Sequence, residues 1–227
     1  MKVLVDKRYL EELKYSRRIG NGKEGVCYLP EDDNRITKIF HEWNKSKKVY
    51  FDDIKNSQIS FPIDILYDNK ENLVGYTMYY LGGEKFVNGF REDLSLQELK
   101  DSYIKIKNII LNLKDVYMYD NCLENMLYDY DLKRINLIDT SRWHLKKDGH
   151  IESINEFNWQ MLNALFNNID WKHFRLNHDS KLYELFISYK YLEQIPTLFM
   201  EILEELELKV SEYKGYNVKK VKDLIIK

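Results

Sequence analysis

The sequence lacks most of the features that mark secreted and membrane proteins. Its only two cysteines, Cys27 and Cys122, lie far apart with no metal-ligand spacing around them, so we expect no disulfide framework and a reducing compartment. No run of about 18 apolar residues is present, so we expect no membrane-spanning helix. Residues 1–15 lack the apolar region of a signal peptide. We therefore expect a cytoplasmic protein without a membrane partner.

An excess of charge of one sign is also missing. The 35 basic and 37 acidic residues give a formal net charge of −2, which provides no electrostatic footprint for nucleic acid. The 227 residues are enough to bury a core in one domain or in two small lobes. Nucleic acid is therefore not an expected partner.

Glycine is scarce, yet three of the nine glycines, Gly20, Gly22 and Gly25, lie close together. They lead into a strand-forming run rather than a helix, which disfavours a dinucleotide-binding turn. The cluster is either a flexible hairpin tip or a loop whose backbone lies close over phosphates. Lys38 follows, on the same face of a predicted strand as Ile36 and Phe40. Such a lysine either meets an anion or extends its ammonium to water.

The periodicity predicts two differently built parts. The first third of the chain has five β-rich runs and one interrupting helix, whereas helical patterns dominate after Gly82-Gly83. In the second part, Ser95 and Glu98 form a capping box at the start of an amphipathic helix. The predicted strands are 16–20, 25–29, 35–40, 61–68, 72–81 and, later, 136–145; the predicted helices are 42–58, 95–114, 155–169, 180–193 and 196–213.

Three polar residues of the second part form a pattern that is typical of metal-dependent chemistry. Asp120 and Asn125 are separated by four residues, and Asp139 follows in an apolar run. An amide oxygen and a carboxylate are hard ligands that suit Mg²⁺, which leaves Asp120 to accept a proton. Each element alone is common, but the order of glycine loop, lysine, Asp–x4–Asn and Asp is specific.

In this order the chain resembles the protein-kinase-like family from about residue 16 to about residue 200. The resemblance implies that Gly20, Gly22 and Gly25 form the glycine-rich loop and that Lys38 holds the phosphates of ATP. It also implies that Asp52, or Asp53 beside it, pairs with Lys38 at the position where the family has a glutamate. Asn125 and Asp139 would bind Mg²⁺, and Asp120 would be the catalytic base.

The resemblance extends to an adenine site. The family's hinge corresponds to residues 75–83, with Met78 as the gatekeeper and the backbone of Tyr79 and Leu81 as hydrogen-bonding partners of adenine. Apolar side chains would cover both faces of the ring. They are Ile19, Cys27 and Ile36 above the ring and Leu127 below it.

Several motifs depart from the protein-kinase pattern. The family's His-Arg-Asp is Met118-Tyr119-Asp120, its Asp-Phe-Gly is Asp139-Thr140-Ser141, and no Ala-Pro-Glu is present. Only a short segment separates Asp139 from the helix predicted at Asn155, whereas protein kinases use a longer one to bind peptides. Kinases of small molecules, of the aminoglycoside and choline type, also lack that segment.

The sequence thus predicts an α+β, bilobal protein-kinase-like fold. Residues 1–81 would form an antiparallel five-stranded N-lobe with one helix, and residues 82–227 a mostly α-helical C-lobe. The predicted function is ATP- and Mg²⁺-dependent transfer of the γ-phosphate to a hydroxyl acceptor, with protein serine or threonine as the first expectation. A small-molecule kinase and a nucleotide-binding pseudokinase that acts as an interaction module remain the alternatives.

Overall fold

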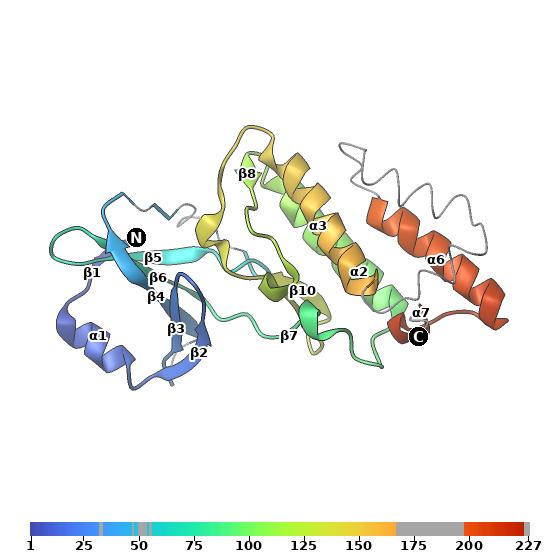
Figure 1. The fold of residues 1–227 in the computed structure, drawn as a ribbon, viewed down its shortest axis with the longest axis horizontal. Coiled ribbons are helices and arrows are strands. Elements are labelled where there is room, and N and C mark those ends of the chain that lie inside the picture. Colours follow the sequence, from blue (N-terminus) through green and yellow to red (C-terminus); the bar gives the residue numbers. More distant parts are fainter. Residues whose placement is uncertain (32–33, 47, 50–53, 55, 167–197, 225–227) are drawn as a thin grey trace. The chain divides into compact units, whose positions relative to one another are not determined.

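The structure, a computed structural model, is a mixed α+β protein and describes residues 1–31, 34–46, 48–49, 54, 56–166 and 198–224. The chain forms two compact units (Figure 1). Unit 1 contains Met1–Gly82 together with Leu137–Trp143, and unit 2 contains Gly83–Asn136 together with His144–Lys227. Among the described helices, none combines the length and the apolar character needed to cross a membrane.

Unit 1 is built on a six-stranded sheet with the order β1-β5-β6-β4-β3-β2. The neighbouring strands are antiparallel except for β1, which runs parallel to β5. One short helix, α1 (Lys7–Leu13), precedes β2, and its N-terminus is capped by the Asp6 carboxylate, which accepts a hydrogen bond from Tyr9 N at 2.8 Å. The strands are β1 (Lys2–Leu4), β2 (Arg17–Asn21), β3 (Gly25–Leu29), β4 (Arg35–Asn44), β5 (Pro62–Tyr67) and β6 (Leu73–Tyr79).

Three predictions for this sheet are wrong in detail. The five predicted strands exist, but β1 adds a sixth, and β6 lies between β4 and β5 rather than at the end of a sequential meander. The helix predicted at 42–58 is not helical in its described residues, because β4 continues to Asn44, which pairs with Leu73. The three-residue β1 is too short for a sequence pattern and owes its existence to pairing with β5.

One face of the sheet of unit 1 carries a compact apolar cluster, in which Ile36 and Phe40 of β4 meet residues of β5 and β6. Lys38 lies on the same face, with its Nζ 6.0 Å from the ring centroid of Phe40 and 5.8 Å from that of Tyr76. The alternation expected for a strand therefore places Lys38 among buried apolar side chains. The other buried members of this cluster are Ile65, Leu73, Tyr76 and Met78.

Two glycines press directly against β4. A Cβ atom on Gly25 would lie 2.2 Å from the carbonyl oxygen of Ile39, and one on Gly75 would lie 2.0 Å from that of Lys38. Both distances are far below van der Waals contact, so only glycine fits at either position. Gly25 therefore has a packing role within the sheet that requires no ligand.

We expect the substitution Gly25→Ala to destabilise the protein by about 3 kcal/mol, because the added methyl group must push β3 away from β4. Gly22→Ala is the matched control, since a Cβ atom there has nothing within 4 Å. Urea unfolding of both variants measures the difference. Equal stabilities for the two variants would show that the sheet yields at Gly25 without cost.

Unit 2 is mostly helical. Its helix α2 (Leu96–Asn112) begins with the predicted capping box, in which Ser95 Oγ accepts a hydrogen bond from Glu98 N at 3.1 Å and the Glu98 carboxylate accepts one from Ser95 N at 3.3 Å. Helix α3 lies alongside α2 (Figure 1), and Tyr103 of α2 stacks on Phe157 with ring centroids 5.6 Å apart. The remaining helices are α3 (Gly149–Phe166), α6 (Leu198–Lys214) and α7 (Val221–Leu224).

Short strands complete unit 2. They form a three-stranded sheet of order β10-β9-β7 and a two-stranded sheet of β11 and β8. The single strand predicted at 136–145 is instead two short strands, because β10 ends at Leu137, Asp139 adopts a left-handed conformation, and β11 begins only at His144. The helix predicted at 180–193 lies outside the described residues. The strands are β7 (Glu84–Lys85), β8 (Val116–Tyr117), β9 (Met126–Asp129), β10 (Arg134–Leu137) and β11 (His144–Leu145), and the single 3₁₀ turns are η1 (Phe86–Asn88), η2 (Leu123–Asn125) and η3 (Thr140–Arg142).

Candidate active site

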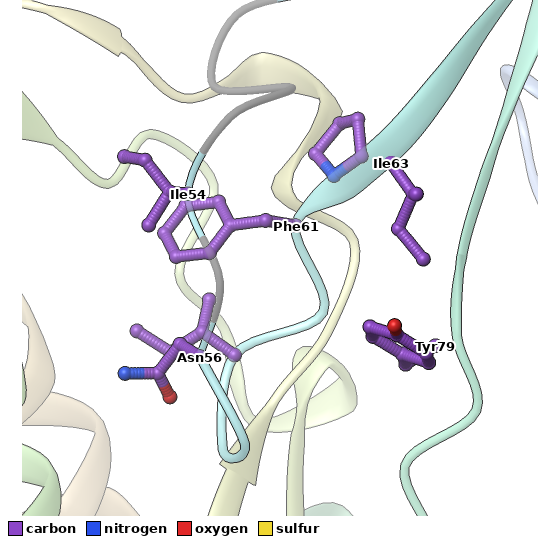
Figure 2. A pocket seen from close by; sticks show the side chains of 7 residues that line it. Ile54, Asn56, Phe61, Ile63 and Tyr79 are labelled. Carbon is purple, nitrogen blue, oxygen red and sulfur yellow. The ribbon is translucent and has the colours of Figure 1, made fainter. Parts of the chain in front are cut away.

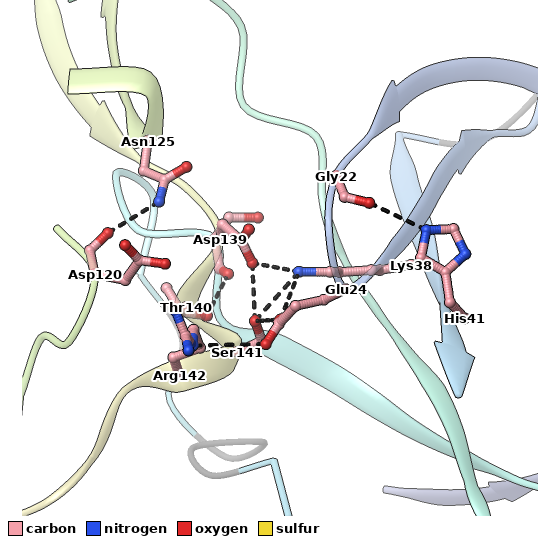
Figure 3. Close-up of polar contacts among 11 residues, drawn as sticks. Gly22, Glu24, Lys38, His41, Asp120, Asn125, Asp139, Thr140, Ser141 and Arg142 are labelled. Carbon is pink, nitrogen blue, oxygen red and sulfur yellow. Dashed lines mark hydrogen bonds and ion pairs between the residues drawn. The ribbon is translucent and has the colours of Figure 1, made fainter. Parts of the chain in front are cut away.

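The most distinctive group of unit 1 is a buried ammonium. The side chain of Lys38 is only 5% exposed, and its Nζ donates hydrogen bonds to Asp139 Oδ1 and, at 3.2 Å, to Ser141 Oγ (Figure 3). Glu24 Oε2 lies 3.5 Å from the same nitrogen. An isolated buried ammonium would be very costly, so these oxygens are what keep Lys38 charged inside the protein.

The titration behaviour of Lys38 reflects these partners. Burial by itself lowers the pKa of the ammonium, but the interactions with Tyr76, Asp139 and Glu24 outweigh burial and raise the pKa above its ordinary value. Lys38 therefore remains cationic at neutral pH. Burial raises the pKa of the nearby Cys27 thiol to about 11. Cys27 is therefore a neutral side chain of the apolar cluster at neutral pH and not a nucleophile.

Asp139 reaches Lys38 because its segment is attached to unit 1 by long-range contacts. Leu137 forms a parallel bridge with Ile59, and Thr140 Oγ1 donates a hydrogen bond to Ser60 O at 2.9 Å. The ring of Trp143 packs edge-on against that of Phe61. Asp139 itself has a φ of 56°, a left-handed conformation that Asp tolerates better than most residues. The left-handed turn lets the carboxylate point at the ammonium while remaining 42% exposed.

A second carboxylate, from the glycine-rich loop, approaches the same cluster. Glu24 Oε2 accepts a hydrogen bond from Ser141 Oγ at 2.8 Å, and Glu24 Oε1 lies 3.6 Å from Arg142 Nε. The predicted acidic partners of Lys38, Asp52 and Asp53, lie outside the described residues. Among the described residues, the acids that contact Lys38 are Asp139 and Glu24.

The loop that carries Glu24 is tied to β4. His41 Nε2 lies within hydrogen-bonding distance, 3.1 Å, of Gly22 O, and His41 N donates to Glu24 O at 2.9 Å. Gly22 N also donates to Gly25 O at 3.0 Å, which closes the turn between β2 and β3. Of the three predicted loop glycines, Gly20 thus lies in β2 and Gly25 begins β3, so Gly22 is the one at the tip.

The residues expected around adenine in unit 1 gather in one place. Ile36 and Met78 are buried in the apolar cluster, and Ile19 and Cys27 pack against it partly exposed. Their shared surface is apolar, as a flat ring requires.

The backbone groups expected to bind adenine differ in their surroundings. The carbonyl oxygen of Tyr79 accepts a hydrogen bond from Ser60 Oγ at 2.8 Å, which uses one of its two lone pairs. Leu81 is buried. Tyr79 also lines a small, mostly apolar pocket of unit 1 that otherwise contains none of the predicted nucleotide-binding residues (Figure 2); its other lining residues are Ile54, Asn56, Ile59, Phe61, Pro62 and Ile63.

The remaining predicted site residues belong to unit 2. Asp120 is exposed and has a φ of 67°, so it too is left-handed. Asn125 Nδ2 donates a hydrogen bond to Asp120 O at 3.0 Å and thereby holds the backbone of the loop between β8 and β9 (Figure 3). The loop begins at Met118, whose N donates to the buried Ser153 Oγ at 2.8 Å. Leu127, the predicted floor residue, is buried in β9.

Comparisons with known proteins add little to this geometry. No protein-family model and no curated protein matches the chain. Among solved structures, the chain is similar to PK-1, a kinase of Cydia pomonella granulovirus, with 16% sequence identity and a TM-score of 0.45. The match covers 61% of this chain and 58% of the viral kinase. A similarity of this extent does not establish an activity or a substrate.

Sequence reasoning missed three members of the Lys38 cluster, namely Glu24, Ser141 and Arg142. Glu24 lies between Gly22 and Gly25 and has no residue pattern of its own, and Ser141 stands where the resembling family has a glycine, which has no side chain. One signal was available: Ser141 and Arg142 lie two and three residues after the predicted metal ligand Asp139, so they belong to the same short segment. Their meeting with Glu24 required the fold, since Glu24 and Ser141 are 117 residues apart.

Proposed function

We propose that the protein is a kinase-like phosphotransferase that uses ATP and Mg²⁺ to phosphorylate a hydroxyl group. One observation carries this proposal: a lysine that is almost fully buried, yet cationic, contacts an aspartate that stays partly exposed. A site for a phosphate and a metal needs both features, a buried cation and a carboxylate that solvent can reach.

Lys38 would hold phosphate oxygens of ATP, since a charged, buried donor binds an anion far more strongly than an exposed one. The residues present also suit Mg²⁺. In unit 1, Asp139 Oδ1 accepts from Lys38, so Asp139 would offer its Oδ2 to the metal. In unit 2, the Nδ2 of Asn125 is occupied as a donor, so Asn125 would offer its Oδ1. When bound, Mg²⁺ would neutralise charge that develops on the transferred phosphoryl group.

A dedicated protein cage for the metal is missing from the described residues, in which no three His, Cys, Asp or Glu side chains cluster. This is the expected situation for Mg²⁺ that is bound mainly through nucleotide phosphates, because Mg²⁺ gives up its water reluctantly and takes only one or two protein ligands.

Asp120 would orient the acceptor hydroxyl and take its proton. Its side chain is exposed, as a base that meets a diffusing acceptor must be, and its backbone is held by Asn125. Both proposed carboxylates, Asp120 and Asp139, have left-handed backbones, and such conformations are often retained where function requires them.

The length of the segment after Asp139 supports one acceptor class over the other. Residues 140–148 consist of η3, the two-residue β11 and a turn, and α3 already begins at Gly149. So short a segment offers little backbone for binding an extended peptide, and this favours the small-molecule alternative over a protein serine or threonine. An assay with radiolabelled ATP, on protein and metabolite fractions of a cell extract, distinguishes the two. Label in neither fraction, despite nucleotide binding, would favour the pseudokinase alternative.

We expect Mg²⁺ and ATP together to raise the melting temperature of the protein, because a ligand that binds only the folded state stabilises it. Lys38→Met should remove most of this shift, since the phosphates lose their buried cation. Each variant is compared with its own ligand-free baseline by differential scanning fluorimetry, with the exposed Lys70→Met as the control. No shift for the unmodified protein at millimolar Mg²⁺ and ATP would contradict the proposed function.

A further inference from the structure

Three hydrogen-bond donors of unit 1 converge on a single carboxylate. Lys38 Nζ lies 3.5 Å from Glu24 Oε2, Ser141 Oγ donates to the same oxygen at 2.8 Å, and Arg142 Nε lies 3.6 Å from Oε1 (Figure 3). An ammonium, a hydroxyl and a guanidinium around one anion form the type of donor set that binds phosphate.

We propose that Lys38, Ser141 and Arg142 form a polyphosphate-binding site and that the Glu24 carboxylate holds the place of a phosphate until a nucleotide displaces it. The proposal deepens the proposed function and rests on it. It assigns Ser141 and Arg142 as phosphate-binding residues and Glu24 as a competing internal anion.

The charges of the cluster favour displacement of the Glu24 carboxylate by a nucleotide over binding of both anions together. Lys38 and Arg142 carry two positive charges, and Asp139 and Glu24 carry two negative ones, so the cluster is neutral as it stands. A nucleoside triphosphate adds several negative charges, and Glu24 would then lie beside phosphate in a site where Lys38 is 5% and Ser141 7% exposed. Like charges this close to the buried Lys38 repel each other, because water screens them less there than at the outer side of the cluster, where the Arg142 side chain is 48% exposed.

The geometry also allows Glu24 to leave without unfolding the loop. The backbone of Glu24 is fixed to β4 by the bond from His41 N, so only the side chain has to rotate. Its contacts with Lys38 and Arg142 are 3.5 and 3.6 Å long, outside the optimal hydrogen-bonding range, and its side chain is already 28% exposed. Lys38 keeps Asp139 and Ser141 as partners once Glu24 has moved.

The rival explanation is that Glu24 is a permanent partner that orients Lys38 for phosphate binding. The two explanations predict opposite changes in the affinity for polyphosphate when Glu24 is replaced by a neutral residue. If Glu24 competes with phosphate, the neutral Glu24→Gln variant binds polyphosphate more tightly, whereas if Glu24 orients Lys38, the variant binds more weakly.

Isothermal titration calorimetry with inorganic tripolyphosphate, and separately with ATP and Mg²⁺, tests the proposal. We expect Glu24→Gln to tighten both dissociation constants about fivefold, and Ser141→Ala and Arg142→Gln to weaken them about three- to tenfold. Glu42→Gln, an exposed glutamate on β4, is the control and should change neither value. The tripolyphosphate titration isolates the phosphate site from adenine binding.

The outcomes separate this proposal from the proposed function. If the unmodified protein binds ATP but Glu24→Gln binds equally or less tightly, Glu24 is not a competing anion and the kinase-like function stands. If Ser141→Ala and Arg142→Gln bind as well as the unmodified protein, the assignment of these donors is wrong. If neither the unmodified protein nor Glu24→Gln binds ATP or tripolyphosphate, both proposals fall.

Discussion

Replacing Asp120 with asparagine is expected to slow phosphoryl transfer by about a thousandfold, because the amide cannot accept the proton of the acceptor hydroxyl. The affinity for ATP should change by less than about twofold, since Asp120 is assigned to the acceptor and not to the nucleotide. Single-turnover transfer from radiolabelled ATP measures the first quantity and calorimetry the second. Asparagine is the right replacement, because it accepts the left-handed backbone at this position as readily as aspartate does.

Asp131→Asn is the matched control for this experiment. Asp131 is also an exposed aspartate of unit 2, in the turn between β9 and β10, and its replacement should leave the rate unchanged. A rate for Asp120→Asn within a few-fold of the unmodified protein would show that another group accepts the proton. A large loss of ATP affinity in the same variant would place Asp120 at the nucleotide instead.

Replacing Asp139 with asparagine is expected to abolish measurable transfer, a loss of at least about a thousandfold, because the substitution removes the negative charge that attracts Mg²⁺ and that pairs with Lys38. Unlike Asp120→Asn, it should also weaken ATP binding, and only the part that depends on Mg²⁺. Titrations of ATP with Mg²⁺ and with EDTA separate that part. The two aspartates therefore predict different pairs of losses, which makes their roles distinguishable.

The control for Asp139→Asn has to reproduce its unusual backbone. Asp148 has the same φ of 56° and is exposed in the turn before α3, so Asp148→Asn tests the effect of the substitution on a left-handed turn alone. Glu24 remains beside Lys38 in the Asp139 variant, so we expect the fold to survive, as circular dichroism can verify. If ATP binding in Asp139→Asn keeps its full dependence on Mg²⁺, Asp139 is not a metal ligand.

The sequence by itself determined the elements whose cause is local. The capping box of Ser95 and Glu98 and the three- and four-residue spacing of apolar side chains specify α2, because a helix is stabilised by neighbours in the chain. The alternation of Ile36, Lys38 and Phe40 likewise specifies the face of β4 on which the lysine lies. The order of Lys38, Asp120, Asn125 and Asp139 was sufficient to nominate these residues as candidates.

Only the tertiary structure decided which groups meet. Lys38 and Asp139 are 101 residues apart, and their contact depends on the bridge between Ile59 and Leu137. No local sequence pattern predicts that bridge. The same is true of Glu24. Its neighbours in the sequence suggested a flexible loop, and only the fold places Lys38, Ser141 and Arg142 around its carboxylate. Strand pairing over long separations is chosen by the sum of many weak contacts across the whole unit. Periodicity therefore predicts the face of an element but not its partner.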